Sequence, residues 1–61
     1  LRLDYSVGEK VRVIDGSFAG VTGTVLEINQ EKNRIKVQVD MLGSTATVDL
    51  DNLQLEKVEY Q

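Results

Sequence analysis

The sequence predicts an all-β fold, a small antiparallel barrel of five short strands. Apolar and polar residues alternate along most of the chain, which is typical of strands with one face in a core and one in water. Nine valines, three isoleucines and four threonines among 61 residues also favour strands, because β-branched side chains lose rotamer freedom in a helix. So short a chain cannot build two ordinary packed sheets, whereas closure into a barrel suits its length and hides the sheet edges.

The first strand is predicted at residues 11–13, where two valines flank an arginine. Asp15 and Gly16 follow it as a strong turn signal, because glycine reaches positive φ without steric cost. Three glycines within residues 16–23 then indicate a compact loop with Phe18 near its tip. A buried packing segment does not need so many glycines, so this loop is suited to presenting a side chain.

The second strand carries Val25 and Ile28, whose spacing of three breaks the strict alternation. This spacing predicts a β-bulge near residues 26–27, a common device for curving a small barrel. Polar residues 29–33 predict a hairpin that leads into the third strand at 34–40.

A second hairpin, at residues 41–44, leads into the fourth strand at 45–50. Residues 51–52 predict a tight corner with one 3₁₀ turn. Residues 53–58 predict a short last strand, although their sequence is also compatible with a helix. Tyr5 is expected to pack over the barrel, and we assign it no function.

Composition argues against catalysis and points to a binding module. The chain has no cysteine and no histidine, which excludes disulfides, cysteine-based metal sites and a Ser-His-Asp arrangement. It has no phosphate-binding glycine loop with its lysine, and no EF-hand spacing. The interior of so small a barrel is filled by its own side chains. We therefore expect no enzyme activity, no metal and no cofactor.

No apolar run approaches the roughly 20 residues that span a membrane, so we expect no membrane association.

Ten acidic and seven basic residues leave a net charge of −3, whereas a free-standing nucleic-acid module usually carries a basic patch. The basic residues do cluster on two predicted strands, where they alternate with valine or isoleucine and so face outward. They are Lys10, Arg12, Arg34 and Lys36. Two interpretations follow: a solvated face that keeps the sheet soluble, which we favour, and an auxiliary contact to RNA.

Residues 7–28 resemble a KOW motif, because VGEKVRV is followed in order by Asp-Gly, Phe-Ala-Gly and a further glycine. The chain downstream is similar to the C-terminal KOW domain of bacterial NusG transcription factors at residues 31–37, 41–43, 48–51 and 56–58. The glycine loop, the Glu-Lys hairpin and the acidic corner occur in order at the family's spacing. The likeness covers nearly the whole chain, from about Tyr5 to Val58.

This resemblance implies a five-stranded SH3-like barrel, which agrees with the strand count above. It also implies a cytoplasmic recruitment module, which we expect to be monomeric. Residues 1–6 would end an interdomain linker, and residues 7–59 would form the KOW domain. An N-terminal domain outside this chain would hold RNA polymerase. The KOW domain would bind NusE, which is a small-subunit ribosomal protein, or the termination factor Rho.

The resemblance places the partner contacts in the loop after the first strand and in the loop between the third and fourth strands. In this chain, these positions and the adjoining strand hold Phe18, Val21, Met41, Leu42, Ser44 and Asp49. Phe18 suits either a partner contact or a plug at the barrel end. The alternation that runs to Val39 favours the core for Met41, with partner contact as the alternative. Leu42 breaks the alternation and is expected to face outward.

Family members typically carry Phe-Gly-Arg in the second loop, whereas this chain has Leu42, Gly43 and Ser44. Aromatic and arginine side chains are common hot spots of interfaces, so their replacement points to altered partners. The alternative function is an RNA-binding KOW domain of a specialised NusG paralogue that acts in processive antitermination. Its phosphate contacts would come from Lys10, Arg12, Arg34 and Lys36.

Overall fold

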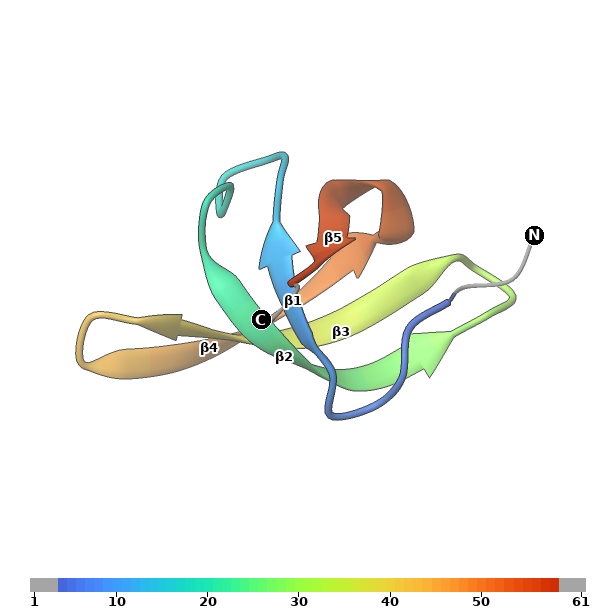
Figure 1. Cartoon of the computed structure of the whole chain (residues 1–61), viewed down its shortest axis with the longest axis horizontal. Coiled ribbons are helices and arrows are strands. Elements are labelled where there is room, and N and C mark those ends of the chain that lie inside the picture. The colour runs from blue at the N-terminus through green and yellow to red at the C-terminus, as the bar shows by residue number, and fades with distance from the viewer. Residues whose placement is uncertain (1–3, 59–61) are drawn as a thin grey trace.

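The computed structural model of the chain describes residues 4–58 and confirms the predicted all-β fold (Figure 1). The elements in order are β1 (Lys10–Val13), β2 (Thr22–Asn29), β3 (Arg34–Met41), β4 (Ser44–Asp51), the 3₁₀ turn η1 (Asn52–Gln54) and β5 (Leu55–Lys57). All strand pairs are antiparallel, and the order across the sheet is β4-β3-β2-β1-β5.

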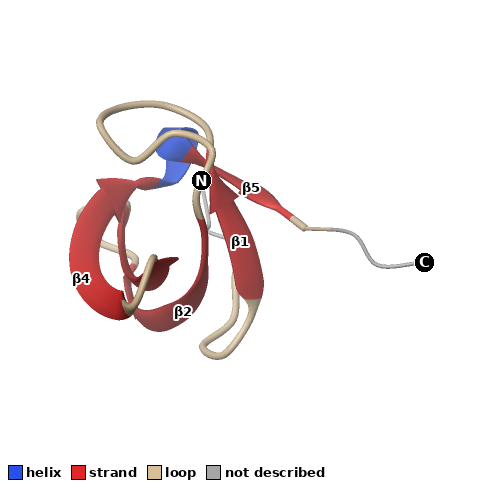
Figure 2. Ribbon diagram, turned by 90° about the vertical axis from the view of Figure 1, so that its left-hand side faces the viewer, coloured by secondary structure: helices blue, strands red, loops and turns tan. Residues whose placement is uncertain are grey.

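The five-stranded sheet curls around its own core into a small barrel of the SH3-like type (Figure 2). The closure is less complete than the sequence suggested. Within residues 4–58, β4 is hydrogen-bonded only to β3, and β5 only to β1, so both remain edges of the sheet. η1 connects these two edge strands at one end of the barrel.

The predicted β-bulge lies in β2. Val25 pairs with Val37, but Glu27 pairs with Lys36, so Leu26 is an extra residue on the β2 side. The insertion resets the alternation, because it lets Val25 and Ile28 both turn towards the core despite their spacing of three.

The core consists of apolar side chains from the concave face of the sheet. The buried members are Val11, Val13, Val25, Ile35, Val37, Val39, Leu50 and Leu55. Tyr5, as expected, packs against this core from before β1. All five strands contribute side chains to this core, and its close packing holds the turns at the barrel ends in place.

Gly23 allows β2 and β3 to approach closely. A Cβ atom built on Gly23 would lie 2.4 Å from the backbone oxygen of Gln38 and 2.7 Å from Cγ1 of Val37. Because neither contact distance is tolerable, the strand pairing requires glycine at this position.

The corner after β4 is the 3₁₀ turn that the sequence predicted, with a capping box at its start. The Asp51 carboxylate accepts a hydrogen bond from the Leu53 N–H at 2.9 Å, and Gln54 Oε1 accepts one from the Asp51 N–H at 3.0 Å. The last strand is shorter than the predicted 53–58, because η1 takes its first residues. Leu53 is consequently exposed rather than paired.

Candidate protein-docking site

The β3–β4 hairpin projects beyond the body of the barrel (Figure 1). Its two-residue turn consists of Leu42 and Gly43, and Gly43 has φ +75°, the left-handed region that glycine adopts at low cost. The Leu42 side chain at this tip is fully exposed, as expected.

The core position that the alternation favoured for Met41 is wrong. Met41 lies on the same side of β3 as Val39, but it is 45% exposed whereas Val39 is buried. The physical reason is the length of the hairpin. At Met41 the strand has already passed the end of the core, so the inward-facing side chain meets solvent.

A shallow apolar hollow lies between the hairpin tip and the start of β2. It is lined by Val21, Asp40, Met41, Leu42 and Ser44, and we call it the tip hollow. The loop and the hairpin converge there because Gly23 pairs with Val39, which brings the residues just before β2 alongside the end of β3. Four of the six predicted contact residues therefore line one site.

The other two predicted contact residues do not line the tip hollow. Phe18 is half-buried and packs against the core, and its carbonyl accepts a hydrogen bond from the Val21 N–H at 3.1 Å. Asp49 lies further along β4, where its Oδ1 accepts a hydrogen bond from Arg34 Nε at 3.2 Å. Phe18 thus helps to close the barrel end, and a partner contact through its exposed part stays a prediction.

Sequence reasoning missed Asp40, which joins the tip hollow. Asp40 is exposed, lies opposite Thr45 on β4, and forms no ion pair or side-chain hydrogen bond within residues 4–58. The only sign in the sequence that Asp40 belongs to this site was its position directly before Met41. An acidic residue in an alternating strand normally indicates a solvated face, so Asp40 was not selected.

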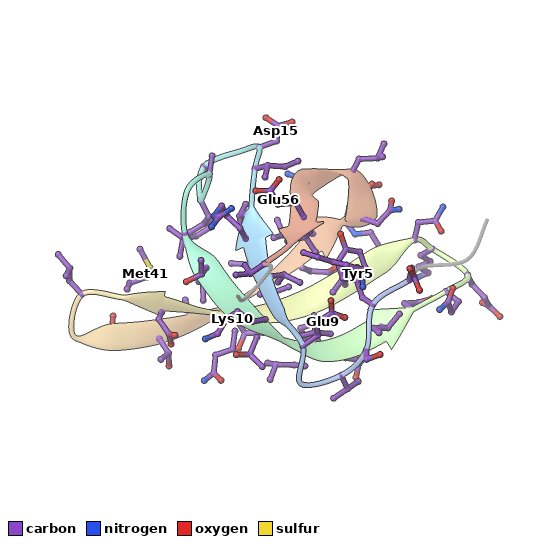
Figure 3. All side chains as sticks on the ribbon, in the orientation of Figure 1. Tyr5, Glu9, Lys10, Asp15, Met41 and Glu56 are labelled. Atoms are coloured by element: carbon purple, nitrogen blue, oxygen red, sulfur yellow. The ribbon has the colours of Figure 1, made fainter. Side chains whose placement is uncertain are left out.

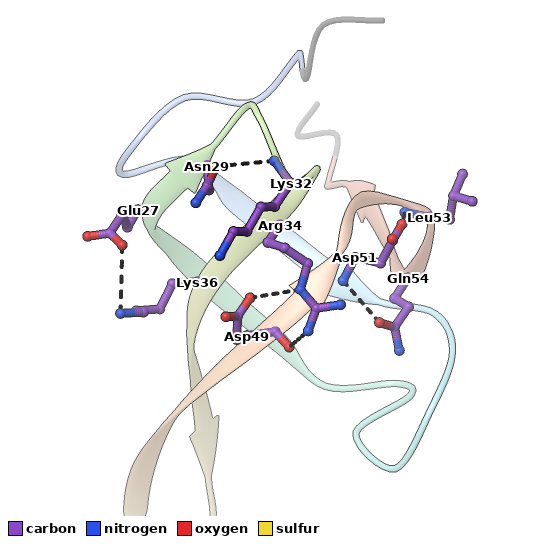
Figure 4. A network of polar contacts seen from close by, with 9 residues as sticks. All are labelled: Glu27, Asn29, Lys32, Arg34, Lys36, Asp49, Asp51, Leu53 and Gln54. Carbon is purple, nitrogen blue, oxygen red and sulfur yellow. Dashed lines mark hydrogen bonds and ion pairs between the residues drawn. The ribbon is translucent and has the colours of Figure 1, made fainter.

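Three of the four candidate RNA-binding residues form ion pairs across neighbouring strands, and Figure 4 shows those of Arg34 and Lys36. Arg12 Nη1 lies 2.7 Å from Glu56 Oε2, Arg34 Nε 3.2 Å from Asp49 Oδ1, and Lys36 Nζ 3.7 Å from Glu27 Oε2. Exposed pairs of this kind contribute about 0–1 kcal/mol each to stability. Their main effect is that each cation is offset by a nearby acid.

Lys10, the fourth candidate, is half-buried and forms no ion pair within the described part of the chain. The structure therefore does not assemble the four cations into one unpaired basic patch. This arrangement favours the interpretation of a solvated outer face.

A polar clasp fastens the segment before β1 to β5, away from the tip hollow (Figure 3). The Tyr5 hydroxyl donates a hydrogen bond to the Leu55 carbonyl at 3.2 Å, and Lys57 Nζ lies 4.8 Å from the centre of the Tyr5 ring. Lys57 Nζ also donates hydrogen bonds to Glu9 Oε2, at 2.9 Å, and to the Asp4 carbonyl.

These contacts shift three pKa values. The hydrogen bond from Lys57 lowers the pKa of the Glu9 carboxyl, and the same bond raises the pKa of Lys57. Burial raises the pKa of the Tyr5 hydroxyl. In Figure 3, Tyr5 and Glu9 lie over the body of the barrel, apart from Met41 on the projecting hairpin, so the clasp is separate from the tip hollow.

Two classes of site are absent from residues 4–58. No cluster of carboxylates or other ligating side chains is arranged to hold a metal ion there. No helix in that range has the length and apolar character needed to cross a membrane.

A five-stranded antiparallel barrel of the SH3-like type is a fold of the KOW type. The model of the KOW motif family matches residues 7–49, so the chain belongs to the KOW family.

Its relatives lie among bacterial NusG proteins, as the sequence resemblance implied. The chain is 47% identical over 57 residues to "Transcription termination/antitermination protein NusG" of Haemophilus influenzae, covering 93% of this chain and 31% of that protein. It is 41% identical over 56 residues to the protein of the same name from Bacillus subtilis, covering 92% of this chain and 32% of that protein.

A solved structure gives the same result for the fold. It is described as "Domain interaction in Thermotoga maritima NusG", with a TM-score of 0.84 and 34% identity, and the match covers 97% of this chain and 33% of that one. The chain thus spans about a third of the length of the NusG proteins that it matches.

Proposed function

We propose that this chain is the recruitment module of a NusG-like transcription factor. Its tip hollow binds a regulatory protein, either the ribosomal protein NusE or the termination factor Rho, in the cytoplasm. A separate domain of the same factor, joined through a linker that ends at residues 1–6, holds RNA polymerase. The KOW domain proper occupies residues 7–59.

The observation that carries this proposal is the exposed apolar tip. Leu42 is fully exposed and Met41 nearly half exposed, and both border one hollow together with Val21. Clustered apolar side chains on the surface of a small, otherwise polar domain are typical of a contact site. Burying a leucine side chain completely contributes about 1.5–3 kcal/mol, which is enough for Leu42 to act as an anchor.

RNA binding through the strand cations is the weaker alternative. Three of those cations would have to leave an acidic partner before they could contact phosphates. The net charge of −3 also opposes approach to a polyanion. A specialised antitermination role through RNA is the competing hypothesis, and the titration described next includes an RNA to test it.

An NMR titration of the labelled chain with NusE, Rho and a structured RNA in turn tests the proposal. We expect one of the two proteins to shift the signals of Val21, Met41, Leu42 and Ser44, with little change in affinity as salt rises. Shifts confined to Lys10, Arg12, Arg34 and Lys36, seen only with RNA and lost steeply as salt rises, would transfer the function to the alternative.

The chain offers a matched pair of variants for the same assay. Leu42 and Leu53 are both strongly exposed leucines, but Leu53 lies in η1 and does not line the tip hollow. Leu42→Ser is expected to weaken partner binding by about tenfold or more, because it removes a buried apolar anchor. Leu53→Ser is expected to leave binding unchanged. Equal losses from both substitutions would contradict docking at the tip.

A further inference from the structure

One edge of β4 pairs with β3, and its other edge pairs with no strand within residues 4–58. β4 has eight residues, whereas the other edge strand, β5, has three. Because the turn of Leu42 and Gly43 has only two residues, Met41 and Ser44 form a hydrogen-bonded pair of the ladder. Such pairs alternate along an antiparallel ladder. Thr45, Thr47, Asp49 and Asp51 therefore turn their backbone N–H and C=O groups away from β3.

Of the eight backbone groups that these four residues turn outward, two are satisfied by side chains (Figure 4). The Asp51 N–H donates a hydrogen bond to Gln54 Oε1 at 3.0 Å, and the Asp49 carbonyl accepts one from Arg34 Nη2 at 3.1 Å. The Asp51 contact agrees with the orientation deduced from the turn, because Gln54 lies in η1 and not in β3. Within residues 4–58, no corresponding group closes the backbone at Thr45 or Thr47. We call residues 45–47 the open edge.

The open edge lacks the usual protection against strand pairing. Natural edge strands carry lysine, proline or a bulge where they must not pair. Residues 44–48 read STATV, with no charge and no proline, and the β3–β4 register runs through them without a shift.

The two sides of the open edge differ in chemistry. On the outer side, Thr45 and Thr47 lie beside Asp40, whose carboxylate has no cationic partner within the described chain. On the inner side, Ala46 and Val48 are half-buried against the core, and the apolar residues Val21 and Met41 of the tip hollow follow. A strand added here would meet an acid on one side and an apolar surface on the other.

We propose that the open edge binds an extended segment of a partner protein in which apolar side chains alternate with lysine or arginine. The segment pairs its backbone with Thr45 and Thr47, which extends the sheet by one strand. Its apolar side chains pack on Ala46 and Val48, and its basic side chains face Asp40. The proposal rests on the proposed function, since it describes how a partner docked at the tip hollow continues along β4.

A second copy of this chain is a poorer occupant of the open edge. Each copy carries a net charge of −3, and pairing would bring two unneutralised Asp40 residues towards one interface. The open edge also offers only three residues. Stable protein interfaces bury about 1,200 Å² or more, which so short an edge does not supply without further contacts.

The probe for this proposal is a blocked peptide of alternating valine and lysine, added to the labelled chain. Amide signals of Thr45 and Thr47 are expected to shift, and their hydrogen exchange to slow. Thr47→Pro removes an N–H that points away from β3, a position where edge strands tolerate proline. It is expected to weaken peptide binding about tenfold, whereas Thr47→Ala keeps the N–H and binds normally.

The outcomes separate this proposal from the proposed function. Peptide-induced shifts at Met41 and Leu42 without slower exchange at Thr45 and Thr47 would overturn edge pairing and leave docking at the tip intact. Slower exchange with peptide, while neither NusE nor Rho perturbs the tip hollow, would support the edge and overturn the proposed function. Equal binding of an alternating valine–glutamate peptide would overturn the charge preference. Slow exchange at Thr45 and Thr47 without peptide, rising with protein concentration, would identify a second copy as the occupant.

Discussion

Val39 and Met41 lie two residues apart on the same side of β3, and substituting each with alanine separates stability from binding. Val39 is completely buried. Val39→Ala removes two buried methyl groups, each contributing about 0.8 kcal/mol, and leaves a cavity that adds a further cost. The free energy of unfolding is therefore expected to fall by about 2 kcal/mol. Met41 is 45% exposed beyond the core, so Met41→Ala is expected to cost less than about 1 kcal/mol.

Urea unfolding measures this difference directly. With a slope of about 1 kcal/mol/M, expected for so small a domain, Val39→Ala lowers the midpoint by about 2 M and Met41→Ala by less than half as much. Binding to a docked partner should show the reverse order, because only Met41 lines the tip hollow. A loss of stability from Met41→Ala equal to that from Val39→Ala would place Met41 in the core and refute the tip hollow as described.

Three further predictions concern the scaffold. Gly23→Ala should lower the free energy of unfolding by about 1–3 kcal/mol in the same assay, since its Cβ would overlap the Gln38 backbone; unchanged stability would mean that β2 and β3 lie further apart. Asp51→Ala should cost about 1 kcal/mol by removing the cap of η1, and no loss would show that the capping box is not stabilising. The lowered pKa of Glu9 means that its bond to Lys57 stabilises the fold fully above pH 4.5, and this contribution is lost as pH falls through the lowered pKa. Glu9→Gln should therefore flatten the acid limb of the stability profile, and an unaltered profile would contradict the clasp.

Local sequence rules predicted the fold well because its elements depend on neighbouring residues. The spacing of Val25 and Ile28 located the bulge, since only an extra residue lets both face the core. The acidic corner at residues 51–52 predicted the 3₁₀ turn, because an aspartate can cap it from its own side chain. The alternation of residues 34–40 marked which side of β3 faces inward.

The features that the sequence did not reveal depend on distance and register. Alternation identifies the side on which Met41 lies, but not that the hairpin has by then left the core. The partner of Arg12 is Glu56, 44 residues away, and only the β1–β5 register brings them together. Asp40 was missed for a similar reason, because its lack of a cationic partner becomes visible only when the neighbouring strands are placed.

Methyl cross-saturation in the complex with NusE or Rho detects directly which side chains touch the partner. When the partner is saturated, the methyl signals of Leu42, Met41 and Val21 are expected to lose intensity, while that of Leu53 is not. Loss at Leu53 with no loss at Leu42 would contradict the claim that the hairpin tip is the docking surface.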